Sequence, residues 1–313
     1  MASLEEQQLP RSFDSVFYGA AGTSVPFTYA GGDRGLFAGG RNPDGNARVL
    51  EIDYITISTT GNASDFGDLT TATGGPAAAS NVSRGLFAGG QVGGSTNIIS
   101  YITFSSLGNA TDFGDLTAAR NQPSGVSSEA GRGVFGGGYV DARSDIMDYV
   151  AIATAGNATD FGNLIAATEY PSGCNDPTRG VFGSGIVGGS SGSNVIQYIT
   201  MGTTGNASDF GDFTTSQYKQ CACASAVGRG LFSGRNNVMQ YITIASTGNA
   251  SDFGDLTANY DGAGSCSNGT RATIAGGQNV STIDYVEIDT TGNASDFGDL
   301  TTIRFHNAGN SGT

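Results

Sequence analysis

The sequence predicts an all-β protein in which six blades of four strands close into a ring, a six-bladed β-propeller. Two observations predict this fold. The phrase TGNASDFGDLT, or a close variant, occurs six times along the chain. A second phrase, RGLFAGG or a variant, precedes each copy, and its arginines follow one another at intervals of 42 to 50 residues. A regular period of this length is typical of propellers and solenoids.

Four short segments in each repeat have the features of strands. In the third repeat they are residues 123–128, which are small, 133–138, which end in glycines, 146–154, which alternate in polarity, and 158–164, which surround a phenylalanine. Alternation with β-branched and aromatic residues between Gly-rich and Asn-rich boundaries favours strands over helices. A single blade leaves faces and edges uncovered, so the six blades are expected to pack around an axis that the small first strands line.

The repeats divide the chain into an arm and one propeller domain. Residues 1–23 lie outside the pattern and are expected to form an N-terminal arm, with the propeller at 24–313. Residues 302–313 read like one more first strand and are expected to close the ring by pairing with the beginning of the propeller. A partial seventh blade made from the two termini is the alternative.

The order of the elements resembles the kelch-repeat family. Double glycines end the second strand in four repeats, as at Gly39-Gly40, and a tyrosine such as Tyr54 follows in every third strand. Phenylalanines such as Phe66 stand where kelch units carry tryptophan. The resemblance covers roughly residues 24–301. It implies the propeller fold and no particular function, since propellers of this type include scaffolds and enzymes.

Charge and composition exclude several classes of function. The formal net charge is −14, with only 14 Lys and Arg residues scattered along the chain. Binding to nucleic acid or to an anionic membrane surface is therefore not expected. The first residues lack the basic and apolar regions of a secretory signal, so synthesis in the cytoplasm without a signal peptide is expected.

Repeated polar residues are interpreted as structural. The first aspartate of each Asp-Phe-Gly is expected to accept hydrogen bonds from backbone N–H groups of a turn; these residues are Asp65, Asp112, Asp160, Asp209, Asp252 and Asp296. A second acidic set, represented by Asp68, is expected to form hydrogen bonds and pair with the repeated arginines. Calcium binding by these carboxylates is the alternative, but no Asp-x-Asp-x-Asp loop is present, so no cofactor is expected. The asparagine of each Gly-Asn-Ala is interpreted as a turn residue rather than a glycosylation site.

The sequence does not predict an enzyme. His306 is the only histidine, and a Ser-His or Cys-His nucleophile pair is not expected. A glycan-active enzyme of sialidase type would need an arginine cluster facing a tyrosine–glutamate pair, and the glutamates form no such set. The four cysteines are expected to be reduced thiols buried in axial strands.

Binding residues are sought in the loops between the second and third strands, because these loops vary while the rest of the repeat is constant. Drift in unconstrained loops is the alternative explanation of this variation. Candidate contacts to a ligand or partner are Tyr139, Tyr170, Tyr218, Tyr260, Arg41, Arg143 and Arg235. Tyrosine stacks on sugars or anchors protein contacts, and arginine binds acidic groups.

The recurring phrase GNASDFGDLT resembles virion structural proteins of marine phages and large algal viruses. The resemblance implies a virion component of the tail, a fibre or the capsid decoration, with other virion proteins as partners and a homo-oligomer within the particle as an option. One hypothesis is a tail or fibre protein that recognises a host-surface glycan or protein through the variable loops. The alternative is a decoration or scaffold protein that docks through residues 1–23.

Overall fold

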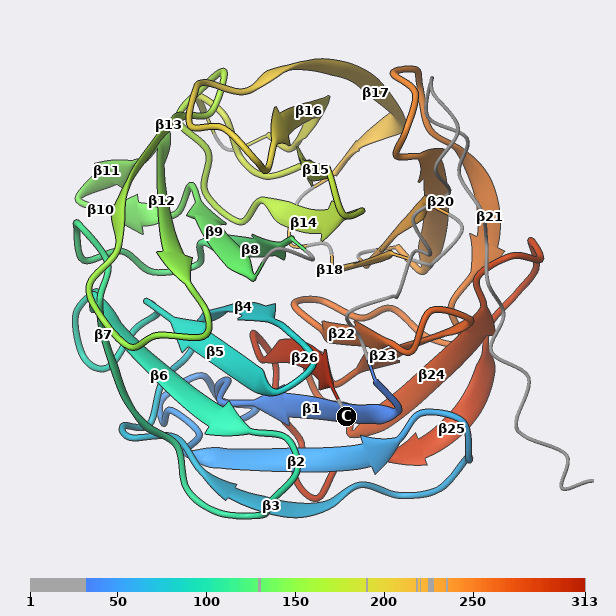
Figure 1. Ribbon diagram of the computed structural model, residues 1–313. Coiled ribbons are helices and arrows are strands. Elements are labelled where there is room, and N and C mark those ends of the chain that lie inside the picture. Colours follow the sequence, from blue (N-terminus) through green and yellow to red (C-terminus); the bar gives the residue numbers. More distant parts are fainter. Residues whose placement is uncertain are drawn as a thin grey trace, which may run out of the picture.

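The computed structural model describes residues 32–128, 131–189, 191–217, 219, 221–224, 228–234 and 236–312. These residues form strands, turns and loops, with no α-helix among them. Six four-stranded antiparallel sheets are arranged as blades around a central axis, as Figure 1 shows in a view along that axis. The predicted six-bladed β-propeller is confirmed.

Each blade runs from an inner strand at the axis to an outer strand at the rim. Blade 1 consists of β26 (Ala308–Gly312), β1 (Arg34–Ala38), β2 (Glu51–Thr56) and β3 (Ser64–Asp68). Blade 2 consists of β4 (Ala77–Ser80), β5 (Arg84–Ala88), β6 (Ile98–Thr103) and β7 (Thr111–Asp115). Blade 3 consists of β8 (Ser124–Ser127), β9 (Arg132–Gly136), β12 (Ile146–Ala151) and β13 (Thr159–Asn163). Blade 4 consists of β14 (Ser172–Asn175), β15 (Arg179–Gly183), β16 (Ser193–Thr200) and β17 (Ser208–Gln217). Blade 5 consists of β18 (Cys221–Ala224), β19 (Arg229–Ser233), β20 (Val238–Thr243) and β21 (Ser251–Asp255). Blade 6 consists of β22 (Gly264–Ser267), β23 (Arg271–Ala275), β24 (Thr282–Glu287) and β25 (Ser295–Asp299). A small hairpin, β10 (Tyr139–Val140) with β11 (Ala142–Arg143), projects from blade 3.

The C-terminal strand closes the ring. β26 pairs antiparallel with β1, from Arg34 opposite Gly312 to Ala38 opposite Ala308. Blade 1 therefore takes its inner strand from one end of the chain and its other three strands from near the opposite end (Figure 1). The pairing covers the edge of β1, which would otherwise be an open template for aggregation. The described termini complete blade 1 and add no partial seventh blade.

A β-bulge in each outer strand explains the repeated phenylalanine. In blade 1, Ile52 lies opposite Gly67 and the next pair is Asp53 with Asp65, so Phe66 is the extra residue of the outer strand. The bulge turns Phe66 into the core, where it is 2% exposed. All six phenylalanines form edge-to-face contacts with the tyrosine of their own third strand, at centroid distances of 5.9 to 6.3 Å.

An outer belt of hydrogen bonds joins each blade to the preceding one. Between β2 and β3, the Gly61 N–H donates to Phe297 O and the Ala63 N–H donates to Asp299 O, both at 2.8 Å. The Asn62 side chain accepts a bond from the Asp299 N–H at 3.1 Å. The same three bonds recur between all neighbouring blades. The asparagines of the belt are Asn62, Asn109, Asn157, Asn206, Asn249 and Asn293.

In the outer belt the asparagine side chains, not the first aspartates, accept hydrogen bonds from backbone N–H groups. The structure therefore does not show the turn role that was expected for the first aspartates. Each of these carboxylates is exposed on an outer strand, and within the described ranges none accepts a backbone hydrogen bond. The physical reason is the bulge, which points the neighbouring phenylalanine inward and the aspartate toward solvent. The six residues are Asp65, Asp112, Asp160, Asp209, Asp252 and Asp296.

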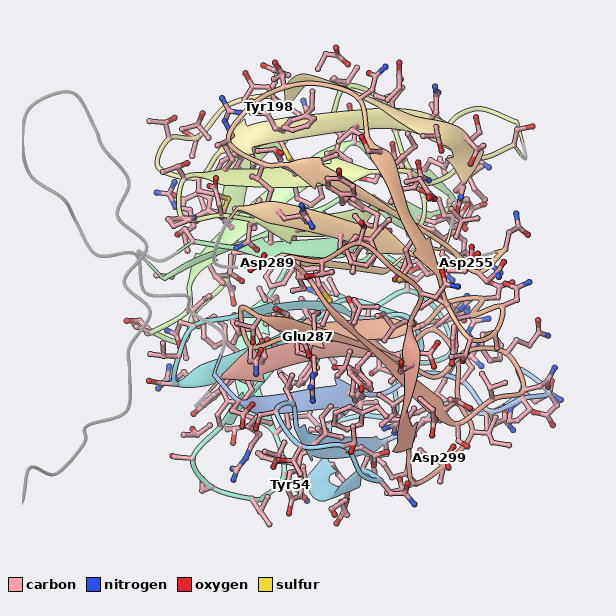
Figure 2. The ribbon with its side chains drawn as sticks, turned by 90° about the vertical axis from the view of Figure 1, so that its right-hand side faces the viewer. Tyr54, Tyr198, Asp255, Glu287, Asp289 and Asp299 are labelled. Carbon is pink, nitrogen blue, oxygen red and sulfur yellow. The ribbon has the colours of Figure 1, made fainter. Side chains whose placement is uncertain are left out.

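The repeated arginines also join blades. Their guanidinium carbons lie 4.4 to 5.4 Å from the centroid of the tyrosine ring of the same blade. In addition, Arg132 Nη1 donates to Met201 O of the next blade at 2.8 Å, and the other five make equivalent bonds. The expected pairing with the second acidic set is therefore wrong. Figure 2 shows Asp255 and Asp299 of that set apart from each other on the outer wall.

Buried polar side chains form a further set of contacts between blades. The residue before each third-strand tyrosine is hydrogen-bonded to the segment that follows the preceding outer strand. Asp148 accepts from Thr117 Oγ1 at 2.5 Å and forms an ion pair with Arg120 at 2.7 Å. Asp53 and Arg304 form an equivalent pair at 2.8 Å, and both side chains are fully buried. Such pairs fix how neighbouring blades fit, because separating the partners would leave a buried charge.

Candidate binding site at the axial mouth

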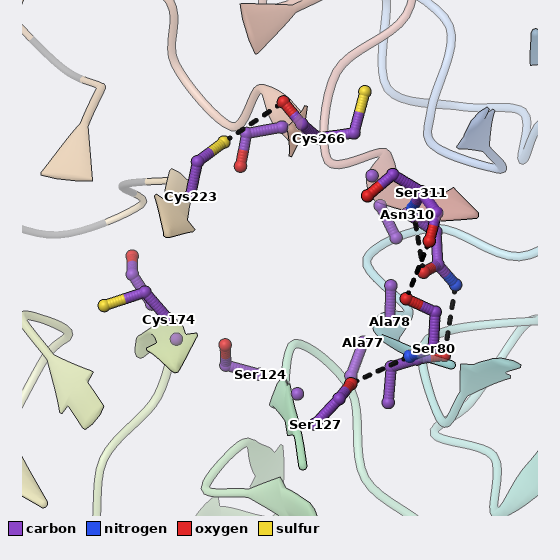
Figure 3. A pocket seen from close by; sticks show the side chains of 18 of the residues that line it. Ala77, Ala78, Ser80, Ser124, Ser127, Cys174, Cys223, Cys266, Asn310 and Ser311 are labelled. Atoms are coloured by element: carbon purple, nitrogen blue, oxygen red, sulfur yellow. Dashed lines mark hydrogen bonds between the residues drawn. The ribbon is translucent and has the colours of Figure 1, made fainter. Parts of the chain in front are cut away.

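The inner strands surround a polar cavity of about 200 Å³ on the axis. Figure 3 shows small side chains around it, among them Ser80, Ser127 and Ser311. The Ser80 N–H donates to Ser127 Oγ at 2.8 Å, and the Ser311 hydroxyl donates to Ser267 O at 2.8 Å. These bonds tie neighbouring inner strands together, so the walls of the cavity are held by the ring itself. Cys174, Cys223 and Cys266 are buried cysteines on its lining strands, and the Cys223 thiol donates to Cys266 O at 3.4 Å.

One end of this cavity opens among loops and is named here the axial mouth. At this end, the connection leading into blades 1 to 4 pairs with the loop between the second and third strands of the same blade, as Asn121 does with Tyr139. The connections and the loops between the second and third strands together form the loop face. Variable loops and connections thus share one face of the ring.

Six equivalent residues, one before each inner strand, surround the axial mouth in a left-handed backbone conformation. Their φ angles lie between 53° and 76°. They form the mouth ring: Gly75, Gln122, Tyr170, Lys219, Gly262 and His306. Backbone hydrogen bonds connect members directly, from the Gln122 N–H to Gly75 O at 3.0 Å and from the Gly75 N–H to His306 O at 2.8 Å.

Four members of the mouth ring are unusual because they carry side chains. The left-handed conformation is easy for glycine and costs a residue with a side chain on the order of 1 kcal/mol or more. Glycine occupies this place twice, at Gly75 and Gly262, so the fold accepts it there. The other four side chains therefore occupy strained positions that the fold itself does not require. Strain of this kind is concentrated at binding and catalytic sites.

The mouth-ring side chains line a small cavity of about 80 Å³. The ring centroids of Tyr170 and His306 are 5.3 Å apart, and Lys219 Nζ lies 5.4 Å from the Tyr170 ring. Lys219 Nζ also forms an ion pair with Asp261 at 3.2 Å. Burial, followed by the nearby Glu169 carboxylate, raises the pKa of Tyr170 to about 12. Its hydroxyl is thus protonated at neutral pH and can donate a hydrogen bond.

His306 is the most distinctive group of the axial mouth. Its side chain is only 6% exposed, yet neither Nδ1 nor Nε2 has a hydrogen-bond partner among the described residues. Burial is the largest cause that lowers the pKa of His306 to about 3, and the positive charges of Lys219 and Arg41 contribute to the same shift. The imidazole is therefore neutral at physiological pH and offers one donor and one acceptor.

Two arginines of blade 1 add positive charge beside the mouth ring. Arg41 Nη2 and Arg48 Nη2 both donate to Gln91 Oε1, at 2.5 and 2.7 Å. Burial and then the charge of Arg48 lower the pKa of Arg41. Arg41 is fixed by an antiparallel bridge to Phe305, the residue before His306. Because both guanidinium groups share the single acceptor Gln91 Oε1, each has further N–H donors, such as its Nε, that could bind an anion.

The structure brings some of the predicted contact residues together and separates others. Arg41 and Tyr170 belong to the axial mouth. Arg143 lies beside it, and its Nε is 3.7 Å from Oε2 of Glu169. Tyr139 is on the loop face in β10, away from the mouth cavity, and its hydroxyl donates to Asp141 O at 3.3 Å. The prediction for Tyr260 is wrong because its side chain is 0% exposed and packs in the core. Tyr218 and Arg235 lie outside the described residues, as does the expected arm at 1–23.

Sequence reasoning missed Gln122, Lys219, Arg48 and the binding potential of His306. The repeats nevertheless carry a signal. The residue two positions before the inner strand changes from repeat to repeat, as Gly75, Gln122 and Tyr170 do, although the phrases DFGDLT and RGLFAGG that precede and follow this region vary little. A position that varies within a constant repeat, on the axis of the ring, marks a surface available for function.

No family model matches the chain, and a search of curated proteins also finds no match. In the part of the chain that the structure describes, no helix has the length and apolar character needed to span a membrane. The same ranges contain no group of three or more His, Cys, Asp or Glu side chains arranged to hold a metal ion.

Proposed function

We propose that this chain is a non-enzymatic recognition protein of a virus particle, a tail or fibre component that binds a host-surface glycan or protein. The observation that carries the proposal is the mouth ring, where four side chains occupy left-handed positions that glycine fills elsewhere in the same ring. Loops and connections place this ring at the centre of one face, where a large partner has access. The assignment to a virion rests on the resemblance of the repeated phrase to virion structural proteins.

Binding without catalysis fits the chemistry of the axial mouth. The nitrogens of His306 form no hydrogen bond with a hydroxyl or thiol of the described residues, the bond by which a histidine activates a nucleophile. The buried acids Asp53 and Asp148 are held in ion pairs between blades, away from the mouth. Glu169 and Asp261 beside the mouth are paired with Arg143 and Lys219. These groups serve to orient and hold a ligand.

Antibody labelling of intact particles tests the proposal. A labelled antibody against the propeller, viewed by electron microscopy, is expected to mark the distal tail or fibre tip, and antibody preabsorbed with purified protein is the control. Label on the head or on a tail ring would instead identify a decoration or scaffold protein. Unlabelled particles, with the protein free in the lysate, would contradict any virion role.

A further inference from the structure

We propose that the axial mouth binds an acidic sugar, a pyranose that carries a carboxylate, as a terminal residue of a glycan. This inference rests on the proposed function and names its ligand class. Arg41 and Lys219 would hold the carboxylate, and His306 would bind a ring hydroxyl. Three independent features carry the assignment, namely charge, hydrogen-bonding capacity and shape.

The axial mouth is positive although the protein is strongly acidic. Among the described residues beside the mouth cavity, the cations are Arg41, Arg48, Arg143 and Lys219. The acids paired with them are Glu169 and Asp261. Two of the four positive charges are thus balanced locally, and the pair formed by Arg41 and Arg48 is not. In a chain of net charge −14, this pair attracts an anionic group to the mouth.

His306 distinguishes a sugar from a simple anion. The neutral imidazole presents one donor and one acceptor in a buried place, and both are unpartnered in the described residues. Sulfate or a bare carboxylate only accepts hydrogen bonds and cannot satisfy the acceptor nitrogen. A hydroxyl group both donates and accepts. Asn307 Oδ1, which lines the same cavity, is a second buried acceptor without a partner. A ligand with several hydroxyls and one carboxylate satisfies the whole set.

The shape of the axial mouth suits a single sugar residue. The mouth cavity of about 80 Å³ shares Pro76, Pro171 and Asn307 with the axial cavity of about 200 Å³ beneath it. An occupant can therefore reach into the axis from above. Glycine at position 262 lets the imidazole of His306 lie close to the backbone, because a Cβ atom there would collide with the imidazole.

Isothermal titration of the full chain with D-glucuronate and D-glucose tests the inference, because these sugars differ at the carboxylate. N-acetylneuraminate serves as a second acidic probe. Glucuronate is expected to bind at least about tenfold more tightly than glucose, the difference typical of a charge-assisted hydrogen bond. Lys219→Met and Arg41→Gln are each expected to lower the affinity for glucuronate by about tenfold or more.

Thr59→Asp is the matched control. Thr59 is exposed in the turn that follows β2, at the end of the ring opposite the loop face, and the substitution shifts the net charge by the same single unit as Lys219→Met. Its affinity for glucuronate is expected to equal that of the wild type. His306→Gln keeps a donor and an acceptor but moves them, so it is expected to weaken both acidic probes while the melting temperature shows that the ring is folded.

Equal affinity for glucose and glucuronate, or equal loss in Thr59→Asp and Lys219→Met, would overturn the inference. If neither glucuronate nor N-acetylneuraminate binds, the inference is overturned as well. In both cases antibody label at the fibre tip would still support the proposed function. Label elsewhere on the particle, combined with tight binding of glucuronate, would retain the sugar site and remove the role in host recognition.

Discussion

Three buried aspartates occupy the same place in different blades and face different partners. Asp53 and Asp148 each meet a buried arginine, whereas Asp284 accepts hydrogen bonds from Thr257 and lies beside Tyr260. Burial is the main cause that raises the pKa of Asp284. Its carboxylate thus has no positive partner among the described residues, and burial makes its ionisation oppose folding.

The two kinds of site are expected to respond oppositely to Asp→Asn. Asp148→Asn leaves the Arg120 guanidinium buried without a counter-charge and is expected to cost about 3–5 kcal/mol of unfolding free energy. Asp284→Asn is expected to be neutral or stabilising at pH 7. A raised folded-state pKa means that the wild type loses stability as pH rises through that value, and the amide removes this loss. Urea denaturation at pH 5 and pH 7 measures both, and equal destabilisation by the two variants would refute the distinction.

His306 provides a pH dependence that can be isolated, because it is the only histidine of the chain. Its pKa of about 3 lies below the unfolded value, so the stability it contributes is present above about pH 6.5 and is lost as pH falls. Relative to His306→Gln, the wild type is expected to lose up to about 1.4 kcal/mol per pH unit below pH 6.5. The raised pKa values of Asp284 and Glu169 act in the opposite direction in both proteins and cancel in the comparison. If the unfolding free energies of the wild type and of His306→Gln changed in parallel between pH 7 and pH 5, His306 would not be buried as a neutral imidazole.

At the scale of single elements, the outer belt explains why one phrase recurs six times. The glycine of Asp-Phe-Gly is the clearest case. A Cβ atom at Gly114 would lie 2.5 Å from Gly156 O of the next blade, and φ at Gly114 is +143°. On the other side of the same contact, a Cβ atom at Gly156 would have no heavy atom within 4 Å.

Gly114→Ala is therefore expected to lower the unfolding free energy by more than about 2 kcal/mol, from backbone strain and from forced separation of two blades. Gly156→Ala, the matched control, is expected to change it by less than about 1 kcal/mol. Asn109→Ala, which removes the acceptor for the Asp68 N–H, is expected to cost about 1 kcal/mol. Thermal unfolding followed by circular dichroism compares the three. A Gly114→Ala variant as stable as Gly156→Ala would contradict the belt.

The strands could be predicted from the sequence, but the roles of their polar residues could not. Period and alternation place the strands of a blade, as in residues 146–154, where β12 is found. The bond from Asn109 to the neighbouring blade depends on how two blades meet, which no local pattern contains. The same limit applies to Asp65, which looks like a turn residue in sequence and is turned outward by the bulge at Phe66.

For the molecule as a whole, closure depends on β26. Deleting residues 308–313 is expected to leave blade 1 with three strands and an open edge at β1, giving a protein that aggregates or melts at a clearly lower temperature. A synthetic peptide of residues 302–313 is expected to restore the melting temperature by adding the strand in trans. Deletion without effect on the melting temperature would show that the ring does not need this closure.

The ring was predictable because every repeat has the same local pattern of strands. The closing strand was predictable because residues 302–313 resemble the beginning of a repeat. The axial mouth was not predictable as a site. Its members come from six separate connections, and only the closed ring brings Gln122, Lys219 and His306 around one cavity. Tyr170 and Arg41, chosen as candidate contacts by residue type, lie at the axial mouth, whereas Tyr260, chosen by the same reasoning, is buried.

The central claim is that repeated residues build the ring while the side chains of the mouth ring serve binding. The most direct test is the melting temperature of the double variant Gln122→Gly and Lys219→Gly. Glycine in a strand or helix normally destabilises by about 0.5–1 kcal/mol, but at these left-handed positions it relieves strain, as Gly75 and Gly262 do in the wild type. The melting temperature is therefore expected to stay the same or rise. A fall of several degrees, about 1 kcal/mol or more, would show that these side chains hold the fold together and would contradict the claim.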